Sequence, residues 1–229
     1  MEDDQDAILA ETRLVPQQRR SREARARIMS AAEELLRNEG AEAFSMMGVA
    51  QGAQMPVGNI YRRFEGKEDL LLALKELVCL RIRNGIAQSV LARGPDNMET
   101  FVRCFAEAVG KAFANDERLN RSLYDQRLVS QKMIDSGRAA RGSIFEIFAG
   151  GLRPYLSQHT PAHADAIARV AFSIIMNAAA LKVRENDAIL AESSWDEIAS
   201  EFGAAAILYI QSNFESPGVG PLQNRPGLD

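Results

Sequence analysis

Apolar residues recur at helical spacing along nearly the whole chain of 229 residues, and this periodicity limits the possible folds more than any other feature. Turn signals separate the periodic stretches, and they lie at Gly40, 52–56, Gly66, 94–95, 115–116, 160–161 and 193–194. No stretch has the strict alternation of a strand. Apolar residues make up 46% of the chain, which is enough for a real core. The sequence therefore predicts an all-α protein.

Composition divides the chain into two tails and two helical domains. Residues 1–20 lack an apolar stripe, and residues 215–229 are rich in proline and glycine, so both segments are predicted to be flexible tails. Between them we expect a small domain of about three helices over 21–67. A larger domain of about six helices should follow over 68–214.

Charge is distributed unevenly around a formal net charge of -4. Residues 1–12 hold five acids and no base, whereas residues 13–67 hold ten Lys or Arg against six acids. Residues 68–229 are again acidic on balance. The small domain is therefore the basic part of an otherwise acidic protein, an asymmetry that orients an encounter with phosphates.

Local signals fix the first helices. Apolar residues from 28 to 36 form one stripe of a helix over about 22–38, and Gly40 is expected to stop it. Ser45 can then cap a short second helix ending near Gly52. A long helix should start after Gly66. Caps also predict three later helix starts: Asp96 with Glu99, Thr160 before Pro161, and Ser194 with Glu197.

The run from Met55 to Leu70 predicts a reading helix followed at once by a second helix. In a helix over about 56–64, Ile60 and Phe64 share the face that packs inward. The opposite face carries Val57, Gly58, Tyr61 and Arg62, with Asn59 at its margin. A glycine inside a helix costs about 1 kcal/mol relative to alanine. Its use here indicates that an outside partner approaches the backbone closely.

The chemistry of this face suits the major groove of DNA. Asn59 can pair with adenine, Val57 can touch a thymine methyl, and Arg62 can reach guanine or phosphate. Ser45, Tyr61 and Lys67 are better suited to phosphates. The predicted DNA-binding residues are Ser45, Met47, Val57, Gly58, Asn59, Tyr61, Arg62, Arg63 and Lys67. The alternative readings are a plain polar helix face, or a face that binds a protein partner in a helical adaptor.

The order of these elements resembles a known family. The string 27–36, Gly40, 44–45, 49–50, Ala53, 58–61, Phe64, 67–68 and 70–71 is similar to the N-terminal domain of TetR-family transcriptional regulators. The detailed match covers about fifty residues, and the helix count and length agree over the rest. The resemblance implies a helix-turn-helix domain that binds a pseudo-palindromic double-stranded DNA operator, and a C-terminal domain that binds a ligand and dimerises.

Two departures from the family pattern concern the phosphate contacts. Gln54 and Pro56 stand in the turn where the family usually has a glycine and a hydroxyl-bearing residue. Gln54 must therefore take up any conformation that glycine adopts freely, while Pro56 can still begin a helix. Gly66 replaces a common serine before Lys67, which weakens a cap slightly.

In the larger domain, the resemblance implies a pocket for a small apolar or amphipathic ligand between helices. The candidate lining residues are Phe101, Phe105, Tyr124, Phe145, Phe148, Phe172, Met176 and Asn177. Aromatic residues in amphipathic helices are mostly core, so plain packing is the competing interpretation. The pair 150–151 either loosens a helix beside the pocket or ends it.

The last two long helices are the implied homodimer interface. Their stripes run through Ile167, Val170, Ile174, Ala178, Leu181, Ile198, Phe202, Ala205 and Tyr209. Small residues at 178–180 and 203–206 permit close helix approach. A two-fold dimer would present two reading heads to half-sites about 34 to 36 Å apart. Burial of the same stripes in a monomer core is the alternative.

An enzyme is the competing class, and the sequence offers little for it. His159 and His163 are four apart, but Pro161 lies between them and no acidic third ligand follows, so no metal is predicted. Phosphate-loop, Walker and G-x-S-x-G patterns are absent from the sequence, and no cofactor is expected. Cys79 and Cys104 are expected to be buried free thiols.

The acidic first residues lack the basic, apolar start of a signal peptide, so a cytoplasmic protein without a membrane segment is expected. Arg13, Arg19, Arg20 and Arg22 either form a minor-groove arm or belong to a solvated tail. The overall prediction is a DNA-binding transcriptional regulator. More specifically, we expect a homodimeric repressor that a small ligand releases from its operator.

Overall fold

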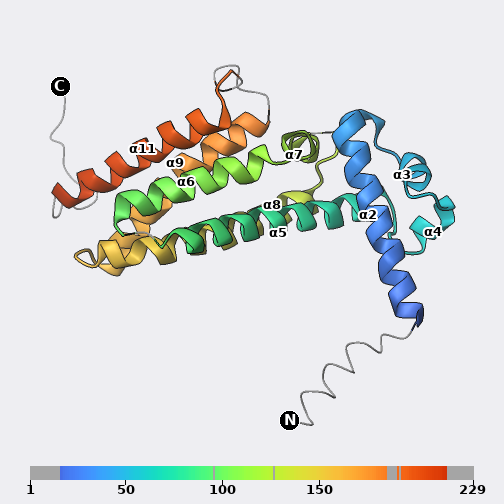
Figure 1. The fold of residues 1–229 in the computed structure, drawn as a ribbon, viewed down its shortest axis with the longest axis horizontal. Coiled ribbons are helices and arrows are strands. Elements are labelled where there is room, and N and C mark those ends of the chain that lie inside the picture. The colour runs from blue at the N-terminus through green and yellow to red at the C-terminus, as the bar shows by residue number, and fades with distance from the viewer. Residues whose placement is uncertain (1–15, 95, 126, 185–189, 191, 216–229) are drawn as a thin grey trace, which may run out of the picture. The chain divides into compact units, whose positions relative to one another are not determined.

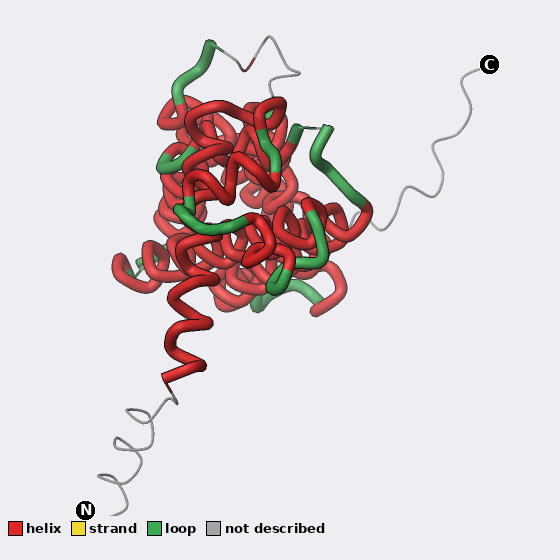
Figure 2. The backbone as a smooth tube through the Cα atoms, turned by 90° about the vertical axis from the view of Figure 1, so that its right-hand side faces the viewer, coloured by secondary structure: helices red, strands yellow, loops and turns green. Residues whose placement is uncertain are grey.

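The computed structural model describes residues 16–94, 96–125, 127–184, 190 and 192–215. Those residues form helices and loops with no strand among them, as the colours of Figure 2 show, which confirms the all-α prediction. The helices form two compact units. The first unit comprises Met1–Leu77 and Arg118–Ser136, and the second comprises Val78–Glu117 and Gly137–Asp229.

The first unit is built on α2 (Pro16–Ala43), α3 (Met46–Gly52), α4 (Val57–Tyr61) and the start of α5 (Lys67–Arg93). It also takes in most of α7 (Glu117–Tyr124) and the start of α8 (Gln131–Leu152). Figure 1 shows α3 and α4 following α2 in a short, tightly turned succession.

Helix α2 begins at Pro16, earlier than the predicted start at Arg22, so residues 16–20 are helical and not tail. Its apolar stripe agrees with the prediction, since Ile28, Ala32 and Leu36 are almost fully buried. Gly40 adopts a φ of 79°, in the left-handed region that glycine adopts readily. It therefore ends the regular helix as expected. The predicted tail residues 1–15 and 216–229, including Arg13, lie outside the described residues.

Helices α6 (Met98–Ala114), α9 (Pro161–Val183) and α11 (Trp195–Glu215) pack on one another in the second unit (Figure 1). Close approach of α6 and α11 depends on glycine. A Cβ on Gly110 would lie 3.1 Å from the Trp195 carbonyl oxygen, and one on Gly203 would lie 3.0 Å from Ala106 Cβ. The small residue at 203 therefore allows close packing of α11 on α6 within the chain.

The start of α6 corrects one prediction. Asn97 is its N-cap, and the Asn97 side-chain oxygen accepts a hydrogen bond from the Thr100 amide at 2.8 Å, so Asp96 and Glu99 do not form a reciprocal cap. The other two caps are confirmed. Thr160 caps α9, with Pro161 in the first turn, and Ser194 pairs reciprocally with Glu197 at the start of α11.

Helix α9 is long and apolar enough to cross a membrane by length and composition, but 56% of its most apolar window is buried inside the protein. Its buried residues include Ile167, Ala171, Phe172 and Ile175. Since α9 packs against α6 and α11, we interpret it as a core helix. Cys79 is half-buried and Cys104 is buried, and neither is part of a disulfide.

Candidate nucleic-acid interface

The first element of the candidate interface is α3. Ser45 precedes it with extended backbone, and the Ser45 Oγ accepts a hydrogen bond from the Gly48 amide at 3.1 Å. This is the predicted N-cap. Met46, Val49 and Ala50 bury one side of α3, and Met47 is left 66% exposed on the other side. Two of the predicted DNA-binding residues, Ser45 and Met47, are therefore on the surface.

The turn from α3 to α4 has the strain that the sequence predicts. Gln54 has a φ of 53°, and it is the only non-glycine residue with positive φ among the residues described. Pro56 stands at the N-cap position of α4, with φ -57° and ψ 138°, and makes no capping hydrogen bond from its side chain. Pro56 therefore lies just outside α4. The sequence predicted it to be the first helical residue, but Val57 has that position.

Helix α4 is shorter than the predicted 56–64, but its inner face is as expected. Ile60 and Phe64 are 0% and 1% exposed, and the Phe64 amide donates to the Ile60 carbonyl at 2.9 Å, which continues helical geometry past Tyr61. The guanidinium of Arg25 on α2 lies 4.7 Å from the centroid of the Phe64 ring. The buried Phe64 ring, just after α4, is thus covered by an arginine of α2.

The outer face of α4 is open. Tyr61 is 53% exposed, Gly58 is exposed, and Val57 is half-buried. A Cβ placed on Gly58 would have no other heavy atom within 4 Å. The internal packing of the protein therefore does not require glycine at this position.

The polar residues of α4 are engaged with one another. Arg62 donates from its guanidinium to the side-chain oxygen of Asn59, and both side chains are at the surface. Arg63 instead donates to the Asn59 carbonyl at 2.9 Å, in a partly buried position at the end of α4. Asn59 and Arg62 can exchange their mutual bond for bonds to bases. Arg63, by contrast, satisfies a carbonyl group at the helix end.

Lys67, predicted to contact phosphate, also makes an internal contact. Its ammonium donates to the Phe44 carbonyl at 2.9 Å and lies 5.5 Å from the centroid of the Phe44 ring. This contact ties the first residue of α5 to the residue that precedes the N-cap of α3. An ammonium carries three donors, so this bond leaves two for another acceptor.

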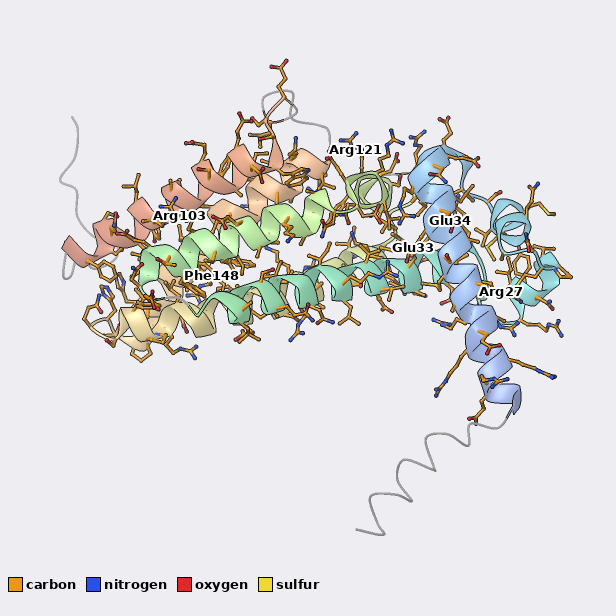
Figure 3. The ribbon with its side chains drawn as sticks, viewed as in Figure 1. Arg27, Glu33, Glu34, Arg103, Arg121 and Phe148 are labelled. Carbon is orange, nitrogen blue, oxygen red and sulfur yellow. The ribbon has the colours of Figure 1, made fainter. Side chains whose placement is uncertain are left out.

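The predicted ligand-binding residues do not all come together. In the second unit, Phe101, Phe105, Phe145, Phe148 and Phe172 form a connected aromatic cluster, with ring centroids 4.7 to 6.1 Å apart. Phe148, labelled in Figure 3, contacts three of the other rings and is fully buried. Met176 is also buried in this unit.

The remaining two candidates lie elsewhere. Tyr124 belongs to the first unit, where its ring lies 3.5 Å from the ammonium of the buried Lys75. Asn177 is exposed on α9. The pair 150–151 lies in the last turn of α8, which ends at Leu152, just before the 3-10 helix η1 (Arg153–Leu156). Gly151 makes room for the aromatic cluster, because a Cβ there would lie 2.2 Å from Phe101 Cε2.

The predicted dimer residues divide into two groups. Ile167, Ala178 and Ile198 are buried inside the protomer, where the alternative interpretation placed them. Six others are at least partly exposed: Val170, Ile174, Leu181, Phe202, Ala205 and Tyr209. Leu208, which the sequence prediction does not include in this stripe, is 66% exposed on α11. The i, i+3 spacing from Ala205 to Leu208 could have identified it.

The side chains of His159 and His163 lie close together. The ring centroids of His159 and His163 are 5.0 Å apart, and the Phe214 ring stacks on His159. Burial, with the neighbouring His163, lowers the pKa of His159. Within the described part of the chain, no group of three His, Cys, Asp or Glu side chains is placed to hold a metal ion.

The capped α3, the turn at Gln54 and the short α4 follow one another in the order of a helix-turn-helix. Residues 28–74 match the family described as bacterial regulatory proteins, tetR family, and this segment includes α3, α4 and the start of α5. The match agrees with the family that the sequence motifs predict. No curated protein matches the chain.

Solved structures share the fold over most of the chain. PfmR, a TetR-family regulator from Thermus thermophilus, is 18% identical with a TM-score of 0.56, over 80% of this chain and 97% of its own. FadR from Bacillus subtilis, solved in complex with stearoyl-CoA, is 14% identical with a TM-score of 0.62, over 80% and 97%. A putative TetR-family regulator from Mesorhizobium loti is 16% identical with a TM-score of 0.64, over 84% and 98%.

Proposed function

We propose that this protein is a sequence-specific, homodimeric transcriptional repressor of the cytoplasm whose α4 reads bases in the major groove of its operator. The proposal rests on the difference between the buried and exposed sides of α4 and the residues just after it. Ile60 and Phe64 are almost fully buried, while Gly58, Tyr61 and the Asn59–Arg62 pair are at the surface. A rigid anchor under an open polar face is what direct base reading requires.

Gly58 gives the sharpest test, because folding and binding make opposite demands on it. Since a Cβ there meets no other atom, Gly58→Ala should stabilise the fold by about 0.5–1 kcal/mol through helix propensity. If α4 lies against DNA, the same methyl should keep the backbone from close approach and weaken binding about tenfold.

The matched control is Gly142→Ala on α8, another exposed helical glycine with no atom near a Cβ. It should raise stability without changing DNA affinity. Urea unfolding and gel shifts with the DNA flanking the protein's own gene measure both quantities. If Gly58→Ala bound this DNA as tightly as the Gly142→Ala protein, close contact at α4 would be wrong.

Base reading is assigned to Asn59 and Arg62. Alanine at either position should cost about 1 to 3 kcal/mol and relax the preference at one base position. Binding measured on duplexes with single base changes would show this. Loss of affinity that is equal on every duplex would assign both residues to phosphate contact. If the wild type gave no salt-sensitive, sequence-selective gel shift, that result would favour a helical adaptor.

The exposed apolar residues of α9 and α11 support the homodimer. Val170, Leu181 and Leu208 are 42%, 43% and 66% exposed, although both helices pack together inside the protomer. Leu208→Glu should place a charge in the interface and give a monomer in analytical ultracentrifugation. Leu91→Glu on α5, at an 81% exposed leucine, is the control and should leave the dimer intact. If the Leu208→Glu protein remained a dimer, α11 would not be part of the interface.

For the effector, we propose an apolar or amphipathic molecule that binds beside the aromatic cluster of the second unit and releases the protein from DNA. The cluster offers five phenylalanine rings, and the structurally similar FadR was solved with stearoyl-CoA. Stearoyl-CoA should raise the melting temperature and abolish the gel shift, whereas free coenzyme A should do neither. Equal effects of both compounds would contradict an apolar effector.

A further inference from the structure

The first turns of α2 carry a dense group of arginines. Between Pro16 and Arg27 there are five arginines and one acid, Glu23. We name this group the arginine turns: Arg19, Arg20, Arg22, Arg25 and Arg27. All five are exposed. In Figure 1 these turns extend beyond α3 and α4, and Figure 3 labels Arg27 at their inner end.

Apart from Arg25, which covers the Phe64 ring, the arginines of these turns contribute little to the fold. From position 18 to Arg27 no residue is buried, and the apolar stripe of α2 begins only at Ile28. The pair Arg19–Glu23 has a 3.4 Å separation, but its side chains are 73% and 62% exposed. Water and salt screen such a pair, so it adds little to stability. The helix therefore projects positive charge that the core does not use.

One residue of the arginine turns contacts the end of the proposed reading helix. Arg25 covers the Phe64 ring, the buried anchor at the end of α4. Arg22 lies one turn earlier, at i-3, and so on the same side of α2. At 1.5 Å per residue, the twelve residues from 16 to 27 span about 18 Å. Since each strand carries one phosphate per 3.4 Å of duplex axis, this length corresponds to about five nucleotides along the axis.

We propose that the arginine turns bind backbone phosphates of the duplex flanking the bases that α4 reads. The partner is DNA because the charge is positive, exposed and adjacent to the reading helix. Guanidinium groups also match phosphate geometry. This inference rests on the proposed function and adds a second, sequence-independent contact surface to it.

The test replaces Arg19, Arg20 and Arg22 together with glutamine, which removes three charges and keeps good helix propensity. Arg25 is left in place because it contacts Phe64. The control replaces Arg103, Lys111 and Arg153 with glutamine. These are three exposed cations of the second unit, so the change in net charge is the same. Far-UV circular dichroism and thermal unfolding should show both triple variants folded like the wild type.

Binding is measured at several salt concentrations on DNA from beside the protein's own gene, as a long duplex and as one trimmed to the footprint of the reading helices. On the long duplex, the R19Q/R20Q/R22Q protein should bind at least tenfold more weakly. Its slope of log K against log salt should flatten by about 0.9 per lost phosphate contact. On the trimmed duplex it should bind like the wild type, and its base selectivity should be unchanged.

An unchanged slope and affinity on the long duplex would overturn the inference, as would an equal loss in the control variant. Loss of base selectivity in the arginine variant would also overturn it, because the arginines would then act on reading and not on flanking phosphates. Each result is distinct from failure of the proposed function. In that case the wild type itself would show no selective binding to either duplex.

Discussion

The hydroxyl of Ser122 donates a hydrogen bond to the Leu36 carbonyl across 3.0 Å in a buried position. Ser122 belongs to α7 and Leu36 to α2, so this bond joins a helix far along the chain to the helix that supports α3 and α4. Nearby in sequence, Asn120 is 2% exposed, and the ammonium of buried Lys75 lies over the Tyr124 ring. Buried polar side chains of α7 therefore help to stabilise the first unit, through the hydrogen bond from Ser122 to α2.

Ser122→Ala should destabilise the protein by about 1 kcal/mol, because it removes a buried hydrogen bond to a main-chain carbonyl. Urea unfolding measures the change. Ser143→Ala is the matched control, since Ser143 makes the same kind of bond to the Ala139 carbonyl at 3.2 Å but in an exposed position. Its effect should stay within about 0.5 kcal/mol. Equal losses in the two variants would mean that burial adds nothing to the Ser122 bond.

Gln54→Gly should stabilise the protein by up to about 1 kcal/mol. The φ of 53° costs a side-chain-bearing residue about 1–2 kcal/mol, and the greater freedom of glycine in the unfolded chain offsets part of the gain. Gln51→Gly, three residues earlier inside α3, should instead destabilise by about 1 kcal/mol. Thermal melts of both variants give the two signs. A destabilised Gln54→Gly protein would show that the Gln54 side chain has a role that outweighs its backbone strain.

Gly151→Ala should destabilise the second unit by about 1–3 kcal/mol, since the new methyl would lie 2.2 Å from Phe101 Cε2 and the ring is fully buried. Gly150→Ala next to it meets no atom within 4 Å and should be neutral or stabilising. Urea unfolding gives the stability, and near-ultraviolet circular dichroism reports on the aromatic cluster. If the two neighbouring substitutions had the same effect, the tight contact between Gly151 and Phe101 would be wrong.

The start of α11 should lose stability in acid. Hydrogen bonds from the Ser194 amide and hydroxyl lower the pKa of Glu197. A depressed carboxyl pKa gives stability that is present above the unfolded-state pKa and is lost as pH falls through the folded-state pKa. Ser194→Ala should raise the pKa of Glu197 toward its ordinary value, as measured by NMR titration. Ser200→Ala, on the exposed side of α11, should leave it unchanged. An unmoved pKa in the Ser194→Ala protein would assign the whole effect to the amide.

Structural features that depend on one residue and its immediate neighbours are predictable from this sequence. The stop at Gly40, the cap at Ser45 and the strained turn at Gln54 all depend on backbone conformation over a few residues. The error at the start of α6 is also local. Asp96 and Asn97 can both act as caps, and only the extended backbone of Asn97, with φ -151°, decides between them.

Contacts across the sequence could not be predicted in the same way. Lys67 bonds to the Phe44 carbonyl, 23 residues away, because a long flexible side chain reaches whichever acceptor the fold brings near. Tyr124 was grouped with the phenylalanines by its place in the sequence, yet it packs on Lys75 in the other unit. The inner face of α4 was predictable because the spacing of Ile60 and Phe64 fixes it. The partners of Arg62 and Arg63 were not.

The first unit is assembled from two separate stretches of chain, ending at Leu77 and running again from Arg118 to Ser136. On a ribosome that adds about 5–20 residues per second, the second stretch is completed roughly 3 to 12 seconds after the first. During that interval the nascent α2, α3 and α4 exist without the Ser122 bond and without Tyr124 beside Lys75. The first unit can therefore be completed only after Ser136 has been synthesised.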